Sequence, residues 1–156
     1  MRFEETLEVS APRAAAWDFL WQIDRLAACL PGCKDVREVE AGKLFKASFE
    51  DSIGPYKVRF DMDITVQESR APEFVRLSAT GRDTHLGTSQ QAALDVSLGE
   101  RDGNRTAVTI AGDVQVLGKV ATLGQFVIKR KVSQLSKQFA ANLAAALEGS
   151  AMRSNA

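Results

Sequence analysis

The sequence has little of what redox or metal chemistry commonly requires, since its 156 residues include two cysteines and one histidine. Cys29 and Cys33 flank Leu-Pro-Gly, which is not the spacing of a CxxC redox motif. One histidine does not complete a zinc site with two cysteines, because such sites need four ligands. We therefore interpret both cysteines as free thiols, and we expect neither a metal nor a cofactor.

An excess of charge of either sign is also missing, because 20 lysine and arginine residues balance 20 aspartate and glutamate residues. This balance gives no reason to expect nucleic acid as a partner. No apolar run approaches the roughly 20 residues of a membrane-spanning helix, and the start Met-Arg-Phe-Glu-Glu does not resemble a secretory signal. We expect a cytoplasmic protein whose membrane contact, if it makes one, is peripheral and at the inner face of the cytoplasmic membrane.

What the sequence does have is an alternation of apolar and polar residues, which predicts strands with one apolar face. The alternation is clearest over 56–66. Short connections make successive strands antiparallel neighbours, and glycines such as Gly81 and Gly112 favour bends that curl the sheet. The seven predicted strands are 3–9, 36–39, 43–50, 56–66, 75–79, 92–98 and 108–116.

Two short helices are predicted directly after the first strand. Ser10 is suited to cap a helix over 12–21, in which Trp17 and Trp21 lie one turn apart. A second helix over 23–29 ends at Leu-Pro-Gly, because proline disfavours helix at the residue before it and glycine permits the turn.

The last third of the chain predicts one long helix. It begins at about Gly118 and ends near Gly149, so the domain covers 1–149 and a flexible tail covers 150–156. Its apolar stripe follows a period of 3.6 residues. The stripe consists of Val120, Leu123, Val127, Ile128, Val132, Leu135, Phe139, Leu143 and Leu147.

A sheet with one apolar face must be covered, and the long helix is the largest apolar surface left to cover it. Small residues on the inner faces, among them Ala79 and Ala92 on strands and Gly124 on the helix, allow two interpretations. Either they leave a cavity, or they permit close packing of helix against sheet. The residues alone leave both interpretations open.

Four stretches of the chain carry a resemblance to a known family. They are Ala28-Cys-Leu-Pro-Gly-Cys33, Ile53-Gly-Pro-Tyr-Lys-Val-Arg-Phe60, Ala111-Gly-Asp-Val-Gln-Val-Leu-Gly-Lys-Val-Ala-Thr-Leu-Gly124 and Lys137-Gln-Phe-Ala-Ala-Asn-Leu143. With the order of the predicted elements, the chain resembles the START-like (SRPBCC) helix-grip superfamily and, within it, the carbon monoxide dehydrogenase G-subunit family. The resemblance covers Arg2 to about Leu147.

The resemblance implies an α+β helix-grip fold, in which a curved seven-stranded antiparallel sheet wraps around the long C-terminal helix. It also implies a non-catalytic accessory protein of a molybdenum hydroxylase that helps to couple this enzyme to the membrane. An internal pocket would then bind a hydrophobic small molecule such as a quinone or a lipid. The predicted pocket residues are Trp21, Phe49, Tyr56, Phe60, Met62, Leu77, Leu94, Ile110, Val120, Leu123, Gly124 and Val127.

Two other functions compete with this one. The chain is alternatively a docking module with a filled interior, which acts on the molybdenum hydroxylase through its surface. It is alternatively a cyclase or hydrolase, as some members of the superfamily are. An enzyme needs polar groups that converge inside the domain, and the inward candidates are Thr88, Gln90 and Tyr56.

Other residues of chemical interest have ordinary structural interpretations. We interpret His85 as a surface residue, since no nucleophile motif accompanies it, and Asp61 and Asp63 as solvated partners of neighbouring strands. The segment 112–119 does not match a phosphate loop in its glycine spacing. The basic cluster 129–131 is interpreted as a solvated helix face that could also attract anionic lipid.

Overall fold

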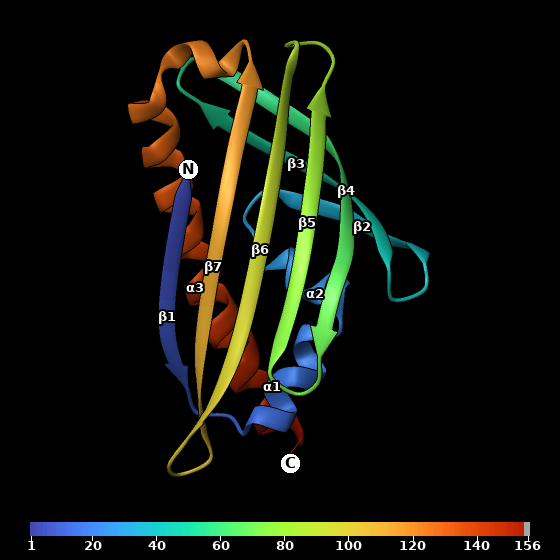
Figure 1. Ribbon diagram of the computed structural model, residues 1–156, viewed down its shortest axis with the longest axis vertical. Helices are drawn as coiled ribbons and strands as arrows, with labels where there is room; N and C mark the ends of the chain where they lie inside the picture. The colour runs from blue at the N-terminus through green and yellow to red at the C-terminus, as the bar shows by residue number, and fades with distance from the viewer. Residues whose placement is uncertain (155–156) are drawn as a thin grey trace.

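Seven antiparallel strands form one curved sheet, in which β1 and β2 are the edges (Figure 1). The order β1-β7-β6-β5-β4-β3-β2 confirms the predicted sheet. The computed structural model describes the backbone of residues 1–154 and the side chains of residues 1–149. The strands are β1 (Arg2–Val9), β2 (Cys33–Glu40), β3 (Leu44–Ile53), β4 (Tyr56–Arg70), β5 (Phe74–Asp83), β6 (Thr88–Arg101) and β7 (Arg105–Gly118).

All helices lie on one side of this sheet (Figure 1). The two predicted short helices are confirmed as α1 (Arg13–Leu20) and α2 (Ile23–Ala28). The long helix α3 (Gln125–Ser154) runs along the sheet, behind β1 and β7 in this view. The chain therefore has the α+β helix-grip arrangement that its sequence predicts.

Both ends of the long helix differ from the prediction. A short 3-10 helix, η1 (Val120–Leu123), follows β7, and α3 begins only at Gln125. Gly118 and Gly124 have φ angles of 93° and 92°, and a right-handed helix cannot pass through such a conformation. At the other end, α3 continues past Gly149, since a glycine inside a helix weakens it without ending it. The predicted flexible tail, 150–156, lies outside the residues whose side chains are described.

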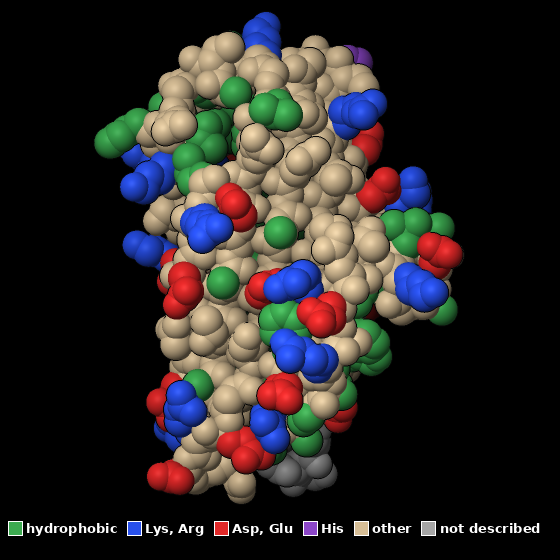
Figure 2. All heavy atoms as spheres, viewed as in Figure 1, with side chains coloured by type: hydrophobic (Ala, Val, Ile, Leu, Met, Phe, Trp, Pro, Cys, Tyr) green, Lys and Arg blue, Asp and Glu red, His purple; other side chains and the backbone are tan. Residues whose placement is uncertain are grey.

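The outer face of the sheet is charged, as the strand alternation predicts. Lysine, arginine, aspartate and glutamate side chains are spread over it in Figure 2. Arg76 on β5 donates to both carboxylate oxygens of Asp95 on β6, and Lys46 on β3 lies 3.4 Å from Asp63 on β4. The interpretation of Asp63 as a cross-strand partner is confirmed.

Candidate ligand-binding cavity

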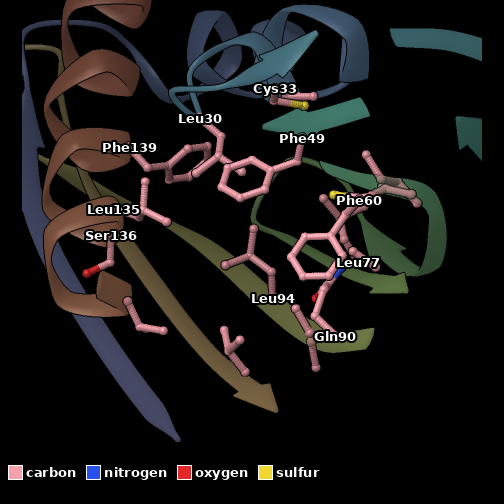
Figure 3. Close-up of a pocket in the computed structure, with 18 of the residues that line it drawn as sticks. Leu30, Cys33, Phe49, Phe60, Leu77, Gln90, Leu94, Leu135, Ser136 and Phe139 are labelled. Atoms are coloured by element: carbon pink, nitrogen blue, oxygen red, sulfur yellow. The ribbon is translucent and has the colours of Figure 1, made fainter. Parts of the chain in front are cut away.

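A cavity of about 240 Å³ lies between the inner face of the sheet and the helices (Figure 3). Its floor is formed by β3 to β7 and by Phe3 of β1, one wall by α3, and its cover by α2 with the loop that follows. Apolar side chains dominate. The lining side chains include Ile23, Leu26, Leu30, Phe49, Ile53, Phe60, Met62, Ile64, Leu77, Ala79, Gln90, Ala92, Leu94, Val114, Val116, Ile128, Lys131, Val132, Leu135, Ser136 and Phe139.

The cavity exists because small residues meet where the sheet passes beneath α3. Ala79 of β5 pairs with Ala92 of β6, and Gly81 pairs with Gln90 one row further along. In the next row Leu94 pairs with Gly112 of β7, where a β-carbon would overlap the ring of Phe3. Larger side chains in these rows would fill the space. Of the two interpretations that the sequence leaves open, the cavity is therefore the one that the structure favours.

The cover is held by contacts of the Leu-Pro-Gly-Cys segment. Gly32 has a φ of 89°, and a β-carbon there would overlap the carbonyl oxygen of Glu50 on β3. The same two residues are joined by a backbone hydrogen bond of 3.0 Å. From the other side, the Asn142 amide of α3 donates to the carbonyl oxygen of Cys29 at 2.9 Å. These contacts fix Leu30 and Cys33 over the cavity.

Part of the cavity wall is aromatic. Phe49 of β3 and Phe60 of β4 stack with ring centroids 6.3 Å apart, and Phe139 of α3 also lines the cavity, near Leu30 in the view of Figure 3. Aromatic rings offer flat apolar contact, which suits a ligand that itself contains rings.

Few polar side chains reach the cavity, and most of these are already bonded. The Ser136 hydroxyl lies 3.1 Å from Oε1 of Glu5 and 3.0 Å from the Ser133 carbonyl oxygen. Lys131 forms an ion pair of 3.3 Å with Asp51, which joins α3 to β3. The exception is Gln90, which is 9% exposed and whose amide bonds no other described residue.

Five of the twelve predicted pocket residues line the cavity. These five come from the sheet, and the alternation of β3 to β6 identified them correctly as inward residues. They are Phe49, Phe60, Met62, Leu77 and Leu94.

The predicted helix residues do not line the cavity, because most of them precede α3. Val120 is fully buried in η1, and its N–H donates to the Thr88 hydroxyl at 3.1 Å. Leu123 packs against Gly54 in the turn between β3 and β4, and Gly124 lies in the link before α3. Val127 precedes Ile128, which lines the cavity in its place.

The other three predicted residues lie elsewhere for different reasons. Ile110 faces inward, but it and its cross-strand partner Val96 are fully buried in close-packed surroundings, away from the cavity. Tyr56 is half-buried at the start of β4, with Nζ of Lys119 5.6 Å from its ring centroid. Trp21 is 45% exposed and stacks on Trp17 with a centroid distance of 5.8 Å.

Sequence reasoning missed the contribution of α2 and of the middle of α3. The residues of α2 alternate over too few turns to show which side faces the cavity. The α3 residues do belong to the predicted apolar stripe. The sequence did not show that the helix begins only at Gln125, and the cavity was therefore placed one to two turns too early along the stripe. The missed residues include Ile23, Leu26, Leu30, Cys33, Ile128, Val132, Leu135 and Phe139.

Both cysteines are free, as predicted; Cys29 is buried and Cys33 is half-buried. Burial raises the pKa of the Cys29 thiol and of the Cys33 thiol, because the thiolate loses hydration. Cys33 lies at the cavity, whereas Cys29 packs in the core. Among the described residues, no cluster of potential ligands is suited to a metal ion.

The single histidine lies in a turn that a buried carboxylate organises. Asp83 accepts backbone N–H bonds of 2.9 to 3.1 Å from Arg59, His85 and Leu86. Burial alone raises the pKa of Asp83, but the three N–H bonds outweigh it, so the pKa lies below its usual value. His85 itself is exposed, and the cavity lies elsewhere.

An apolar and basic surface lies where β7 passes into α3. Phe126, in the first turn of α3, is 76% exposed, and the Arg130 guanidinium lies 5.5 Å from its ring centroid. Leu117, Lys119 and Lys129 are exposed in the same part of the chain. No described helix is long and apolar enough to cross a membrane.

Comparison with known proteins gives one family and a set of similar folds. The family model CoxG, which describes the G subunit of carbon monoxide dehydrogenase, matches residues 6–148. No curated protein matches the chain.

Solved structures resemble the chain over almost its whole length. A conserved protein from Geobacillus kaustophilus is 21% identical, with a TM-score of 0.84 over 96% of this chain and 97% of that one. A protein from Chromobacterium violaceum is 16% identical, with a TM-score of 0.67 over 94% and 97%. The Zhui aromatase/cyclase from Streptomyces sp. R1128 is 14% identical, with a TM-score of 0.65 over 98% and 94%. These likenesses establish the fold.

Proposed function

We propose, from the premise that this chain belongs to the CoxG family of carbon monoxide dehydrogenase, that it is a non-catalytic accessory protein which binds a hydrophobic small molecule in its cavity. Its partner is a molybdenum hydroxylase of the carbon monoxide dehydrogenase type. The bound molecule is a quinone or a lipid, and the protein helps to couple the enzyme to the membrane. The observation that carries the proposal is the apolar cavity of about 240 Å³.

The energetic cost of an empty cavity supports a binding role. At about 24 cal/mol for each Å³, a closed void of 240 Å³ would cost about 6 kcal/mol relative to a filled core, which is an upper bound for a pocket that is partly open. That cost is a large part of the stability of an ordinary domain. A ligand that fills the space recovers much of it, and apolar walls with few polar groups suit such a ligand.

The same cavity weighs against the docking module with a filled interior. It also offers little to an enzyme, because the described lining residues include no histidine, aspartate or glutamate. Of the inward polar candidates, the Thr88 hydroxyl accepts the N–H of Val120, and Tyr56 lies outside the lining. The aromatase/cyclase of similar fold therefore supports the existence of a ligand cavity more than it supports catalysis.

The experiment that tests binding is a ligand titration on protein with an open or a filled cavity. Ala92→Leu places a larger side chain in the cavity, and Ala41→Leu makes the same change in an exposed turn. A short-chain quinone should raise the melting temperature of the wild type and of Ala41→Leu, because a ligand that binds only the folded state stabilises it. It should leave Ala92→Leu unchanged. Equal shifts in all three proteins would place the ligand outside the cavity.

Coupling to the membrane would use the exposed surface around Phe126. An exposed aromatic side chain can enter the lipid interface, and each basic residue adds about 1 kcal/mol near an anionic surface. Phe126→Asp should reduce flotation with phosphatidylglycerol vesicles, whereas Val39→Asp, at another exposed apolar residue, should not. Equal flotation of both variants and the wild type would remove this part of the proposal.

The partner is tested by co-purification from the host. A tagged chain should retain a molybdenum-containing hydroxylase, as membership of the family predicts. Retention by Ala92→Leu as well would separate docking from ligand binding. Recovery of the tagged chain alone, from cells that express the hydroxylase, would argue against an accessory role.

A further inference from the structure

Gln90 is the most deeply buried polar side chain of the described cavity lining that bonds no other described residue, and its amide borders the cavity. It is 9% exposed, lies on the inner face of β6 and makes no side-chain hydrogen bond to another described residue. An amide has donors and an acceptor, and leaving them unpaired away from water is unfavourable. An ordinary core residue at this position would be apolar. The amide therefore needs an account that the fold itself does not supply.

The surroundings of Gln90 place its amide at one end of the cavity. Its partner across the strands is Gly81, where a β-carbon would lie 2.8 Å from Nε2 of Gln90. The same β-carbon would lie 3.1 Å from Cβ of Phe60 and from Cγ of Met62. The absence of a side chain at Gly81 thus makes room for the amide between apolar walls. Figure 3 shows Gln90 near Phe60 and Leu77, on the opposite side of the cavity from α3.

The size of the cavity limits what can meet this amide. An apolar cavity of about 150 Å³ accommodates benzene, so 240 Å³ scales to about ten non-hydrogen atoms. That is two fused rings, and it is too little for a complete long acyl chain. The stacked rings of Phe49 and Phe60 offer flat surfaces to such a compound.

We propose that Gln90 determines the specificity of the cavity, by donating a hydrogen bond from Nε2 to one oxygen of a compact ring compound. The ligand is an apolar body of one or two rings that carries a carbonyl or a similar acceptor at one end. This inference rests on the proposed function and narrows the class of ligand. Gly81 is the positioning residue, since it leaves the space that the amide occupies.

The test compares two probes of nearly equal shape, 1-tetralone and tetralin, of which only the first has a carbonyl. Their affinities are measured by isothermal titration calorimetry on the wild type, Gln90→Leu and Gln91→Leu. Gln91 is the matched control, because it carries the same side chain one residue further on and is exposed on the outer face. Neither probe alkylates thiols, so Cys33 does not complicate the measurement.

We expect Gln90→Leu to weaken 1-tetralone about tenfold or more, since one hydrogen bond to a buried group is lost. Tetralin should bind Gln90→Leu at least as tightly as the wild type, which also shows that the variant is folded. Gln91→Leu should bind both probes normally. If Gln90→Leu does not fold, Gln90→Met replaces it with the same expectations.

The outcomes separate this inference from the function on which it rests. If both probes bind, but Gln90→Leu changes their affinities equally or not at all, the role of Gln90 is refuted and a binding cavity stands. If neither probe binds the wild type, the cavity does not take compact ring compounds and this inference falls, whereas the proposed function is decided separately by the quinone titration of the wild type, Ala41→Leu and Ala92→Leu. A selective loss of 1-tetralone with Gln91→Leu as well would also refute the assignment.

Discussion

The same strands line both ends of the space between the sheet and α3. One end is packed with side chains, which we call the filled end, and the other contains the cavity, which we call the hollow end. At the filled end, Val75 pairs with Val96 and Val96 with Ile110, and all three are fully buried. Beside them pack residues of α1 and of the last part of α3, such as Phe19 and Leu143. At the hollow end the corresponding rows contain Ala79 with Ala92, Gly81 with Gln90, and Leu94 with Gly112.

Strand pattern and residue size therefore carry separate information about the interior. Alternation decides which side chains face α3, and it is the same at both ends. Size decides whether those side chains meet the helix. Packing at the filled end stabilises the domain, so the hollow end does not need to be closely packed. A cavity costs stability, so a domain can retain one only where other packing compensates.

The largest expected effect comes from removing side chains at the filled end. Leu143→Ala should reduce the free energy of unfolding by about 3 to 4 kcal/mol, because the side chain is fully buried and leaves a new void. Leu94→Ala, at the hollow end, should cost about half as much, since that side chain already borders empty space. Urea unfolding of both variants measures the difference. Equal losses would mean that the hollow end is packed as tightly as the filled one.

Adding side chains should reverse the order of the two ends. Ala16→Leu, in the fully buried part of α1, should destabilise by about 1 to 3 kcal/mol through overpacking. Ala92→Leu should stabilise the ligand-free protein by about 1 kcal/mol, because it fills existing space. The sign is the diagnostic quantity, and thermal unfolding is sufficient to determine it. Destabilisation by both changes would contradict a cavity beneath α3.

The contrast between the filled and the hollow end also explains which parts of the site could be predicted from the sequence. Alternation predicted the sheet and five inward residues of the cavity, because a period of two is a local property. It also predicted Ile110, which does not line the cavity. Alternation shows that a residue faces inward, but it does not show whether that residue lies at the filled or the hollow end of its strand. The helix residues before Gln125 were assigned to the cavity because periodicity continues through η1, and only the backbone at Gly124 interrupts it.

The turn between β5 and β6, at the hollow end, should be held mainly by the hydrogen bonds of Asp83. The stability of the protein should therefore depend on pH. The pKa of Asp83 lies below its usual value, so its favourable contribution is complete above the unfolded pKa of about 3.9. It is lost as the pH falls below that value, through the folded pKa. Asp83→Asn should therefore destabilise by about 1 to 2 kcal/mol at pH 7, and by progressively less as the pH falls below the unfolded pKa. A difference that does not shrink on acidification would show that charge is not the cause.

The smallest expected effect is a difference in reactivity between the two thiols, of which Cys33 borders the cavity and Cys29 lies in the packed core. Raised pKa values leave little thiolate at pH 7, so both should react slowly with methyl methanethiosulfonate. Cys33 should nevertheless react several times faster than Cys29, because it borders the cavity while Cys29 is buried. Mass spectrometry of Cys33→Ser and Cys29→Ser resolves the two rates. A bound ring compound should slow Cys33 and leave Cys29 unchanged, whereas protection of neither thiol would place the ligand away from the cover that Leu30 and Cys33 form.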